Sequence, residues 1–233
     1  DLYATGQPIQ MPELSPLTYG HTDARLILRV GGSMGDVYGQ RLLKRDLNGY
    51  ILNEEGVGLA MENKETYLGS ILPKMNMGWS LGFGYKGVNL GMTFTGRFGG
   101  IVISETQSVL DAAGVSKVSA DVRDAGGVQI NQSKVSAQTY YQTIQGTAAY
   151  YTYSATNVRL GELSLSYTLP KKWFDNKVGM TVGLVGKNLW MIYCKAPFDP
   201  ELTTSAASNF YQGFDAYMLP STRNFGFNVK FQF

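Results

Sequence analysis

The sequence predicts an all-β protein whose antiparallel strands form the wall of a transmembrane β-barrel. Three observations predict this fold class: strand-like alternation, few charges, and short connections that alternate with long ones. Charged residues make up only 16% of the chain, against about 25% in typical soluble domains. Aromatic residues reach 12% and there are 28 glycines. A lipid-facing surface excludes charge and collects aromatic side chains at both interfaces, so this composition favours a barrel wall.

Alternation is clearest in residues 76–86, where large apolar residues take every second position. The apolar positions are Met77, Trp79, Leu81, Phe83 and Tyr85, and they alternate with Gly78, Ser80, Gly82, Gly84 and Lys86. Successive side chains of a strand point to opposite faces, so one face is apolar and the other small or polar. The pattern resumes over residues 88–98. The two segments predict a hairpin with a tight turn at Lys86-Gly87.

Three later segments show the same period of two. They are "GELSLSYTLP" (161–170), "VGMTVGLVGKNL" (178–189) and "RNFGFNVKFQF" (223–233). Weaker strand candidates are residues 25–30 and 36–45. The small or polar face carries mainly Gly, Ser, Thr and Asn, which suits a hydrated lumen better than an open aqueous surface.

The lengths of the predicted connections also favour a barrel. Strands are joined by about two residues near Gly87 and about eight at 170–177, whereas long segments separate the others at 99–157 and 190–222. Short and long connections that alternate put all the long ones at one end, as in outer-membrane barrels. We therefore expect 99–157 and 190–222 to be extracellular loops.

Aromatic residues are expected at the two lipid interfaces. Trp79, Tyr85, Tyr167, Trp173 and Trp190 lie near predicted strand ends, where aromatic girdles occur.

Several other classes of protein are disfavoured. The net charge is +2 and the basic residues are dispersed, so no nucleic-acid surface is expected. The single Cys194 excludes an intrachain disulfide, and with His21 as the single histidine a zinc site or catalytic triad is not expected. We therefore expect the chain to have no enzymatic activity and to bind no cofactor. No apolar run approaches the roughly 18 residues of a membrane helix. Residues 1–16 lack a signal-peptide pattern, so an export signal is expected elsewhere.

Two short motifs are better explained by local structure. Gly82-Phe-Gly84-Tyr-Lys-Gly87 matches the dinucleotide pattern G-x-G-x-x-G. That motif requires a helix after its last glycine, whereas a strand-like segment follows here. Asp46-x-Asn48-Gly49 resembles the start of a calcium loop but lacks its later ligands. Asn-Gly is a strong turn former, so a turn is expected.

Candidate substrate contacts come from one tyrosine-rich segment and two basic residues. Within residues 138–157 the tyrosines are Tyr140, Tyr141, Tyr150, Tyr151 and Tyr153. They could stack on sugar rings or peptide side chains, or they could pack a folded loop. Arg97 and Lys230 lie on the polar face of their predicted strands and are further candidates. The final Phe233 is typical of the C-terminal signal for barrel assembly.

Six segments together resemble a known family. They are "DVYGQRLLKRDLNGYI", "YLGSILPKMNMGWSLGFGYKGVNLGMTFTGRFGG", "VRLGELSLSYTLPKKW", "VGKNLWMI", "FDPE" and "LPSTRNFGFNVKFQF". In this order, from about residue 30 to Phe233, they resemble C-terminal landmarks of SusC/RagA-type TonB-dependent outer-membrane transporters.

This resemblance implies that residues 1–233 are the C-terminal segment of a large 22-stranded barrel closed by an N-terminal plug. It implies import of oligosaccharides or peptides across the bacterial outer membrane. The implied partners are outer-membrane lipid, a SusD-like surface lipoprotein and the TonB complex. The chain supplies about seven or eight strands, and an open sheet edge is not viable in a bilayer. The remainder of the same barrel and plug is therefore also an expected partner.

Three alternatives remain open at this point. A passive outer-membrane porin would share the strands, a soluble β-sandwich could bind glycans, and an outer-membrane protein could be purely structural or adhesive.

Overall fold

The computed structural model describes residues 9–10, 22–54, 58–131, 133–174, 178–202 and 213–232. Most of the described elements are antiparallel β-strands, joined by a few short helices. The prediction of a mainly antiparallel β protein is therefore confirmed. The chain divides into two compact units. The helix-containing unit comprises residues 1–72, 100–154 and 201–218, and the sheet unit comprises residues 73–99, 155–200 and 219–233.

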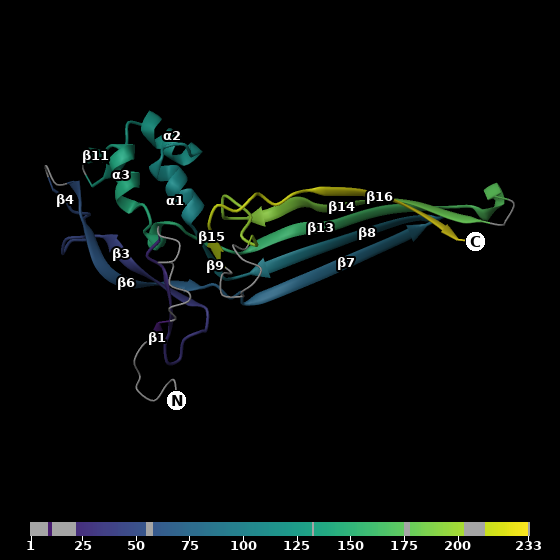
Figure 1. The fold of residues 1–233 in the computed structure, drawn as a ribbon, viewed down its shortest axis with the longest axis horizontal. Helices are drawn as coiled ribbons and strands as arrows, with labels where there is room; N and C mark the ends of the chain where they lie inside the picture. The colour runs from purple at the N-terminus through teal and green to yellow at the C-terminus, as the bar shows by residue number, and fades with distance from the viewer. Residues whose placement is uncertain are drawn as a thin grey trace. The chain divides into compact units, whose positions relative to one another are not determined.

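The sheet unit is built on one five-stranded antiparallel sheet in the order β16-β14-β13-β8-β7 (Figure 1). Its strands are β7 (Met75–Tyr85), β8 (Val88–Phe98), β13 (Asn157–Leu169), β14 (Gly179–Cys194) and β16 (Asn224–Gln232). All five strands predicted most clearly from the sequence are confirmed. β13 begins earlier and β14 ends later than predicted, because a β-bulge in their pairing interrupts the regular alternation there.

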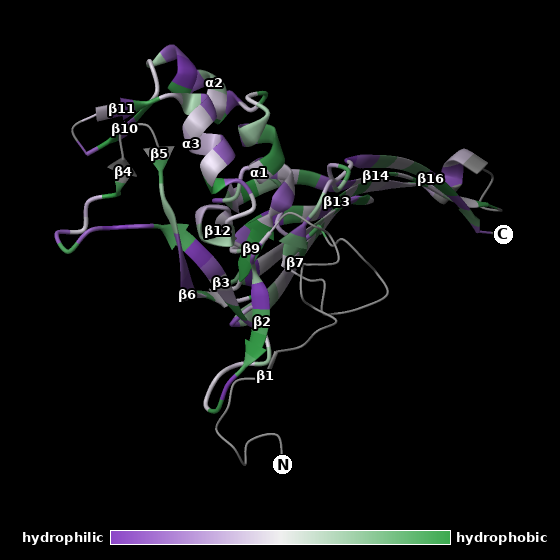
Figure 2. Ribbon diagram, turned by 60° about the vertical axis from the view of Figure 1, so that its left-hand side comes forward, coloured by the Kyte–Doolittle hydropathy of each residue, from purple (hydrophilic) through white to green (hydrophobic). Residues whose placement is uncertain are grey.

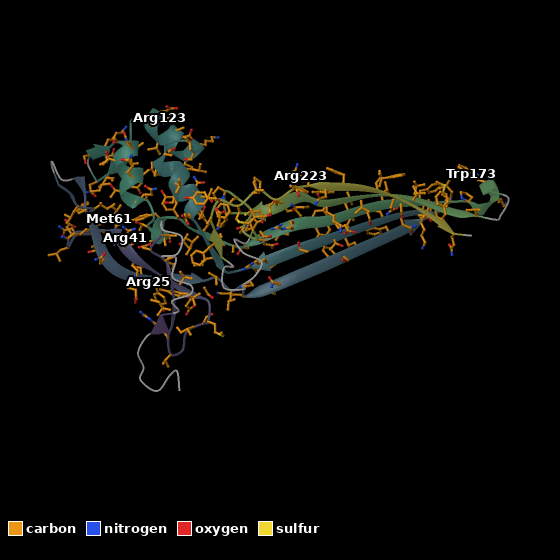
Figure 3. The ribbon with its side chains drawn as sticks, viewed as in Figure 1. Arg25, Arg41, Met61, Arg123, Trp173 and Arg223 are labelled. Carbon is orange, nitrogen blue, oxygen red and sulfur yellow. The ribbon has the colours of Figure 1, made fainter. Side chains whose placement is uncertain are left out.

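Both short connections lie at the same end of this sheet. Lys86 and Gly87 join β7 to β8 with φ angles of 46° and 87°, which suits a tight hairpin turn. A Cβ atom on Gly87 would lie 2.8 Å from the carbonyl oxygen of Thr168, so this position requires glycine. Residues 170–178, including the 3₁₀ turn η4 (Lys171–Phe174), join β13 to β14. Trp173 is labelled at that tip in Figure 3. The long connections leave the opposite end, as the alternation predicted.

The expected position of two tryptophans is wrong. Trp79 lies in the middle of β7, and Trp190 lies four positions before the last residue of β14. They share one cross-strand row with Phe94 and Leu160 between them. For Trp190 the expectation failed because β14 extends further than its alternation showed.

The segment 99–157, expected to be a loop, is folded. Its elements are β9 (Ile101–Ser104), α1 (Glu105–Ala112), α2 (Lys117–Asp124), β10 (Val128–Ile130), β11 (Ser133–Val135), α3 (Ala137–Ile144), η3 (Ala148–Tyr150) and β12 (Thr152–Ser154). The three helices are capped at their N-termini by Ser104, Ser116 and Ser136. The hydroxyl oxygen of each serine accepts a hydrogen bond from the backbone N–H three residues later. These helices have only eight residues each, and α2 is largely hydrophilic (Figure 2), so they carry little helical periodicity.

The segment 190–222 is also not a single loop. Residues 190–194 belong to β14, and β15 (Phe214–Asp215) pairs in parallel with β9. Residues 203–212 lie outside the described part of the chain.

The N-terminal part forms a second antiparallel sheet in the order β1-β2-β3-β6. Its strands are β1 (Ile9–Gln10), β2 (Arg25–Leu28), β3 (Asp36–Leu43) and β6 (Met61–Ser70), and a short pair, β4 (Asn53–Glu54) and β5 (Gly58–Leu59), lies between β3 and β6 in the sequence. Both weaker strand candidates are confirmed. β6 was missed because its charged segment "MENKETYLGS" does not alternate.

Asp46 forms a turn, as predicted. Its side-chain Oδ1 accepts the backbone N–H groups of Asn48 and Tyr50, both at 2.8 Å.

Two hydrophobic clusters form the core of the helix-containing unit. One comprises the buried residues Ala24, Leu26, Val37, Ile71, Ile103 and Ala148. The other comprises Leu43, Leu59, Ile130, Val135, Tyr141, Ile144 and Tyr151. No helix in the described ranges is long and apolar enough to cross a membrane.

The carboxylate of Asp23 ties the N-terminal sheet to the start of η3. Asp23 Oδ1 accepts a hydrogen bond from the backbone N–H of Ala148 at 2.7 Å, and Asp23 Oδ2 accepts one from the backbone N–H of Gln40 at 3.0 Å. We expect Asp23→Ala to lower the free energy of unfolding by about 2 kcal/mol or more, because the N–H groups of buried Ala148 and half-buried Gln40 lose their acceptor. Asp46→Ala is the matched control: it also frees two N–H groups, but in an exposed turn, and should cost less than about 1 kcal/mol. Urea unfolding of the full chain in detergent, followed by hydrogen exchange at Ala148, measures both. Equal losses of stability in the two variants would contradict the structural role given to Asp23.

Candidate functional site: the polar face of the five-stranded sheet

Cross-strand pairing aligns the small and polar side chains on one face of the five-stranded sheet. One complete row contains Ser80, Thr93, Glu162, Lys187 and Asn224. The Ser80 and Thr93 hydroxyls lie 3.1 Å apart, and Lys187 Nζ lies 3.7 Å from Glu162 Oε2. The row therefore presents hydroxyl, amide and charged groups together.

All charged residues of these five strands lie on this same face. They are Arg97, Arg159, Glu162, Lys187 and Lys230. Arg159 and Glu162 are three positions apart, which would place them on opposite faces of a regular strand. The register shift between Leu160 and Glu162 adds one residue, Gly161, and brings both onto the polar face.

Arg159 forms the most enclosed charge pair on this face. Its Nη1 and Nη2 donate to the two carboxylate oxygens of Asp199 at 3.0 and 2.7 Å, which is bidentate geometry. Nε and Nη2 also donate to Asn157 Oδ1 at 3.3 and 3.2 Å. The two charged side chains are only 11% and 8% exposed. This group holds the segment after β14 against the start of β13.

The two predicted basic contacts lie at opposite ends of the polar face. Arg97 stands in a row with Asn76 and Asn157, near the end with the long connections. Lys230 pairs with Thr181 near the end with the short connections. Both residues line the same face, but they are too far apart along the strands to touch one small ligand.

The opposite face of the sheet is apolar and exposed. Side chains on it that are more than half exposed are Met77, Trp79, Phe83, Tyr85, Leu184, Trp190, Phe225, Phe227 and Phe231. Contiguous apolar surface of this extent is unusual on a soluble monomer and marks a surface that contacts lipid or protein. The two faces therefore require different surroundings.

The predicted tyrosines lie in the helix-containing unit and act mainly in packing. Tyr141 and Tyr151 are buried, whereas Tyr140, Tyr150 and Tyr153 pack against the same core cluster. Burial raises the pKa of Tyr140, Tyr141 and Tyr151, and raises that of Tyr153 to about 12. The sequence left open whether these tyrosines bind substrate or pack a folded loop, and their environment here is that of a folded, packed segment. Their role as substrate contacts stays a prediction.

Two residues singled out in the sequence, Phe233 and His21, lie outside the described residues. Within the described ranges, no group of three or more His, Cys, Asp or Glu side chains is arranged to hold a metal ion.

Sequence reasoning missed the charged groups that organise the polar face: Arg159, Glu162, Lys187 and Asp199. Glu162 fell on the polar face of its predicted strand, so the face on which it lies could be predicted from the sequence. Asp199 lies in the "FDPE" segment, which was noted only for its resemblance. Their pairing depends on the bulge at Gly161, which leaves no clear mark in the sequence.

Two neighbouring tyrosines provide a test of the packing role. Tyr150 Oη accepts the N–H of buried Leu43 at 3.1 Å, whereas Tyr151 Oη has no hydrogen-bond partner among the described atoms. We expect Tyr150→Phe to cost about 1–3 kcal/mol, because the Leu43 N–H is left unpaired. Tyr151→Phe should change stability by less than about 1 kcal/mol or raise it. Urea midpoints and hydrogen exchange at Leu43 distinguish them. Faster exchange at Leu43 in Tyr151→Phe alone would contradict the prediction.

The comparisons with known proteins identify a related fold. No protein-family model matches the chain. No curated protein matches it either. A solved structure of the RagAB peptide transporter matches 82% of this chain with 20% identity and a TM-score of 0.53. The RagAB peptide importer in its "closed-closed" state matches 80% with 17% identity and a TM-score of 0.50. The chain covers only 21% of the length of each matched chain. The chain is therefore similar in fold to part of these structures.

Proposed function

We propose that this chain is part of a TonB-dependent outer-membrane transporter of the SusC/RagA type. The observation that carries the proposal is the separation of the two faces of the five-stranded sheet. Five charged residues occur in its strands, and all five lie on the polar face. Fold similarity to the RagAB structures supports the same proposal.

The apolar face supplies the lipid-facing wall of the barrel. A Lys or Arg on the lipid face costs about 2–4 kcal/mol at the bilayer midplane, which explains why that face carries none. Tyr85 and Tyr167 lie beside the short connections, and Trp79 lies six positions from Tyr85 along β7, roughly 20 Å away. Tyr85 and Tyr167 then mark one lipid interface, and Trp79 contacts lipid further into the membrane.

The sheet must continue into further strands. β7 and β16 are its edges, and unpaired edge groups are not tolerated in lipid. The remainder of the same barrel supplies the missing strands, so that residues 1–233 form the C-terminal segment of a 22-stranded barrel with an N-terminal plug.

The polar face lines the transport path. The enclosed Arg159–Asp199 pair is satisfied within the chain and keeps the wall rigid, whereas the more exposed Glu162–Lys187 pair can exchange hydrogen bonds with a passing solute. Arg97 and Lys230 contact substrate near opposite ends of the path. The long connections face the cell exterior, where a SusD-like lipoprotein covers the barrel. The TonB complex supplies the energy that moves the plug.

The transported solutes are oligosaccharides or peptides. Hydroxyl, amide and charged groups on the polar face suit hydrogen bonding to either class, and the matched structures are described as a peptide transporter and a peptide importer. The chain performs no covalent chemistry and needs no cofactor.

An uptake assay tests the proposed function. The intact protein is produced in the outer membrane, and uptake of labelled peptides and oligosaccharides is measured with and without a protonophore. The proposal predicts saturable uptake that stops when the energy supply is removed. Uptake that continues unchanged would identify a passive porin, and no uptake of either class would leave only a structural or adhesive role.

Adjacent positions on β13 test the orientation of the sheet. Leu165 lies on the apolar face between Leu90 and Leu184, and Ser166 lies on the polar face. We expect Leu165→Lys to destabilise the inserted protein by about 2–4 kcal/mol, because it places a charge in lipid. Ser166→Lys should assemble normally.

The fraction of folded protein in outer-membrane extracts, assayed by its resistance to detergent at room temperature, measures both variants. Equal assembly of Leu165→Lys and Ser166→Lys would contradict a lipid-facing apolar surface.

A further inference from the structure

A cavity of about 530 Å³ lies among the three helices of the helix-containing unit. The end of α1 contributes Asp111, α2 contributes Ser119 and Arg123, and the start of α3 contributes Ala137 and Gln138. Cavities of this size commonly hold small ligands in proteins. All residues that line it come from the segment 111–142, so the cavity belongs to one compact unit.

Asp111 gives the cavity a buried negative charge. The residue is only 5% exposed, and its Oδ1 accepts one hydrogen bond, from Gln107 Nε2 at 2.7 Å. Among the described ion pairs none involves Asp111. A buried carboxylate without a cationic partner is costly, so a cation that entered the cavity would be favourably bound.

Arg123 gives the same cavity a positive charge that is also unpaired. Its Nη1 donates to the carbonyl oxygen of Gly114 at 3.3 Å, and no described carboxylate lies within ion-pair distance of it. The N–H groups of Ala137 and Gln138 lie in the first turn of α3, where they have no intrahelical acceptor. Together these groups favour an anion.

We propose that this cavity binds a small zwitterion, of the size of an amino acid or a short peptide. The ammonium group of the ligand pairs with Asp111. Its carboxylate pairs with Arg123 and the first turn of α3. The amide of Gln142, which also lines the cavity, faces polar groups between the two ends of the ligand. The hydroxyl of Ser119 is buried and donates to the carbonyl oxygen of Ser116 at 2.9 Å, so it shapes the wall of the cavity without contacting the ligand. An uncharged sugar satisfies neither charge. The site is independent of the proposed transport function, since it requires neither lipid nor a plug.

The charge requirement can be tested with four matched compounds. Isothermal titration on the full chain in detergent compares Ala-Ala, N-acetyl-Ala-Ala, Ala-Ala amide and maltose. We expect Ala-Ala to bind and each capped dipeptide to bind at least about tenfold more weakly, because each loses one charged contact. Maltose should not compete. Absence of Ala-Ala binding, equal binding of the capped dipeptides, or binding of maltose in the same cavity would overturn the proposal.

Two variants assign the ends of the ligand. Asp111→Asn keeps an acceptor for Gln107 but removes the charge, so it should weaken Ala-Ala at least about tenfold and leave N-acetyl-Ala-Ala unchanged. Arg123→Gln should weaken Ala-Ala similarly and leave Ala-Ala amide unchanged. Asp121→Asn, an exposed residue of α2 outside the cavity lining, is the matched control and should bind like the unmodified chain.

Hydrogen exchange of α1 and α3 reports whether each variant keeps its fold. Should Asp111→Asn unfold, Arg123→Gln alone decides the outcome, because Arg123 is exposed and has a single weak internal contact. Unchanged Ala-Ala affinity in Arg123→Gln would overturn the site. Because binding is measured without transport, loss of uptake with retained Ala-Ala binding would count against the proposed function only.

Discussion

The five-stranded sheet depends on keeping charge off one of its faces. Its strands have ordinary alternation, but β13 carries two charged residues whose spacing would put one of them on the apolar side. The bulge at Gly161 removes this conflict by adding a residue between Arg159 and Glu162. As a result Glu162 meets Lys187 across the pair, and Arg159 reaches Asp199. The apolar face stays continuous from Trp79 to Trp190.

The long connections of the sheet do not behave as ordinary loops. They leave one end of the sheet and contribute to a unit with its own hydrophobic clusters. Strand β9, helix α3 and the tyrosines contribute buried side chains to these clusters. Folded connections of this kind can hold a defined cavity, and the unpaired charges of Asp111 and Arg123 give that cavity a chemical preference.

The sequence predicted the regular parts of the fold well and the irregular parts poorly. Period-two alternation identified β7, β8, β13, β14 and β16. Each of these strands has one apolar face and one small or polar face, and this pattern is visible within a few consecutive residues. It missed β6, whose exposed charges do not alternate, and the short helices, whose eight residues are stabilised by serine caps and tertiary packing.

Site prediction succeeded in the same uneven way. Arg97 and Lys230 were placed on the correct face because strand parity determines it. Arg159 and Asp199, 40 positions apart in the chain, meet only through the folded bulge and the turn after β14. Tyr141 and Tyr151 were grouped correctly by sequence, but their burial depends on contacts with Leu43 and Ile130 that alternation cannot reveal.

Tryptophan quenching by brominated lipid tests the central assignment most directly. The chain has three tryptophans, and replacing two of them by Phe leaves Trp79, Trp190 or Trp173 as a single reporter. The measurement uses proteoliposomes of the intact protein in which tryptophans outside residues 1–233 are also replaced by Phe. Trp79 and Trp190 should be strongly quenched by lipid brominated in its acyl chains and protected from aqueous iodide. Trp173, at the tip with a short connection, should show weaker lipid quenching. If iodide quenches Trp79 and Trp190 while brominated lipid does not, the apolar face does not contact the membrane and the transporter assignment fails.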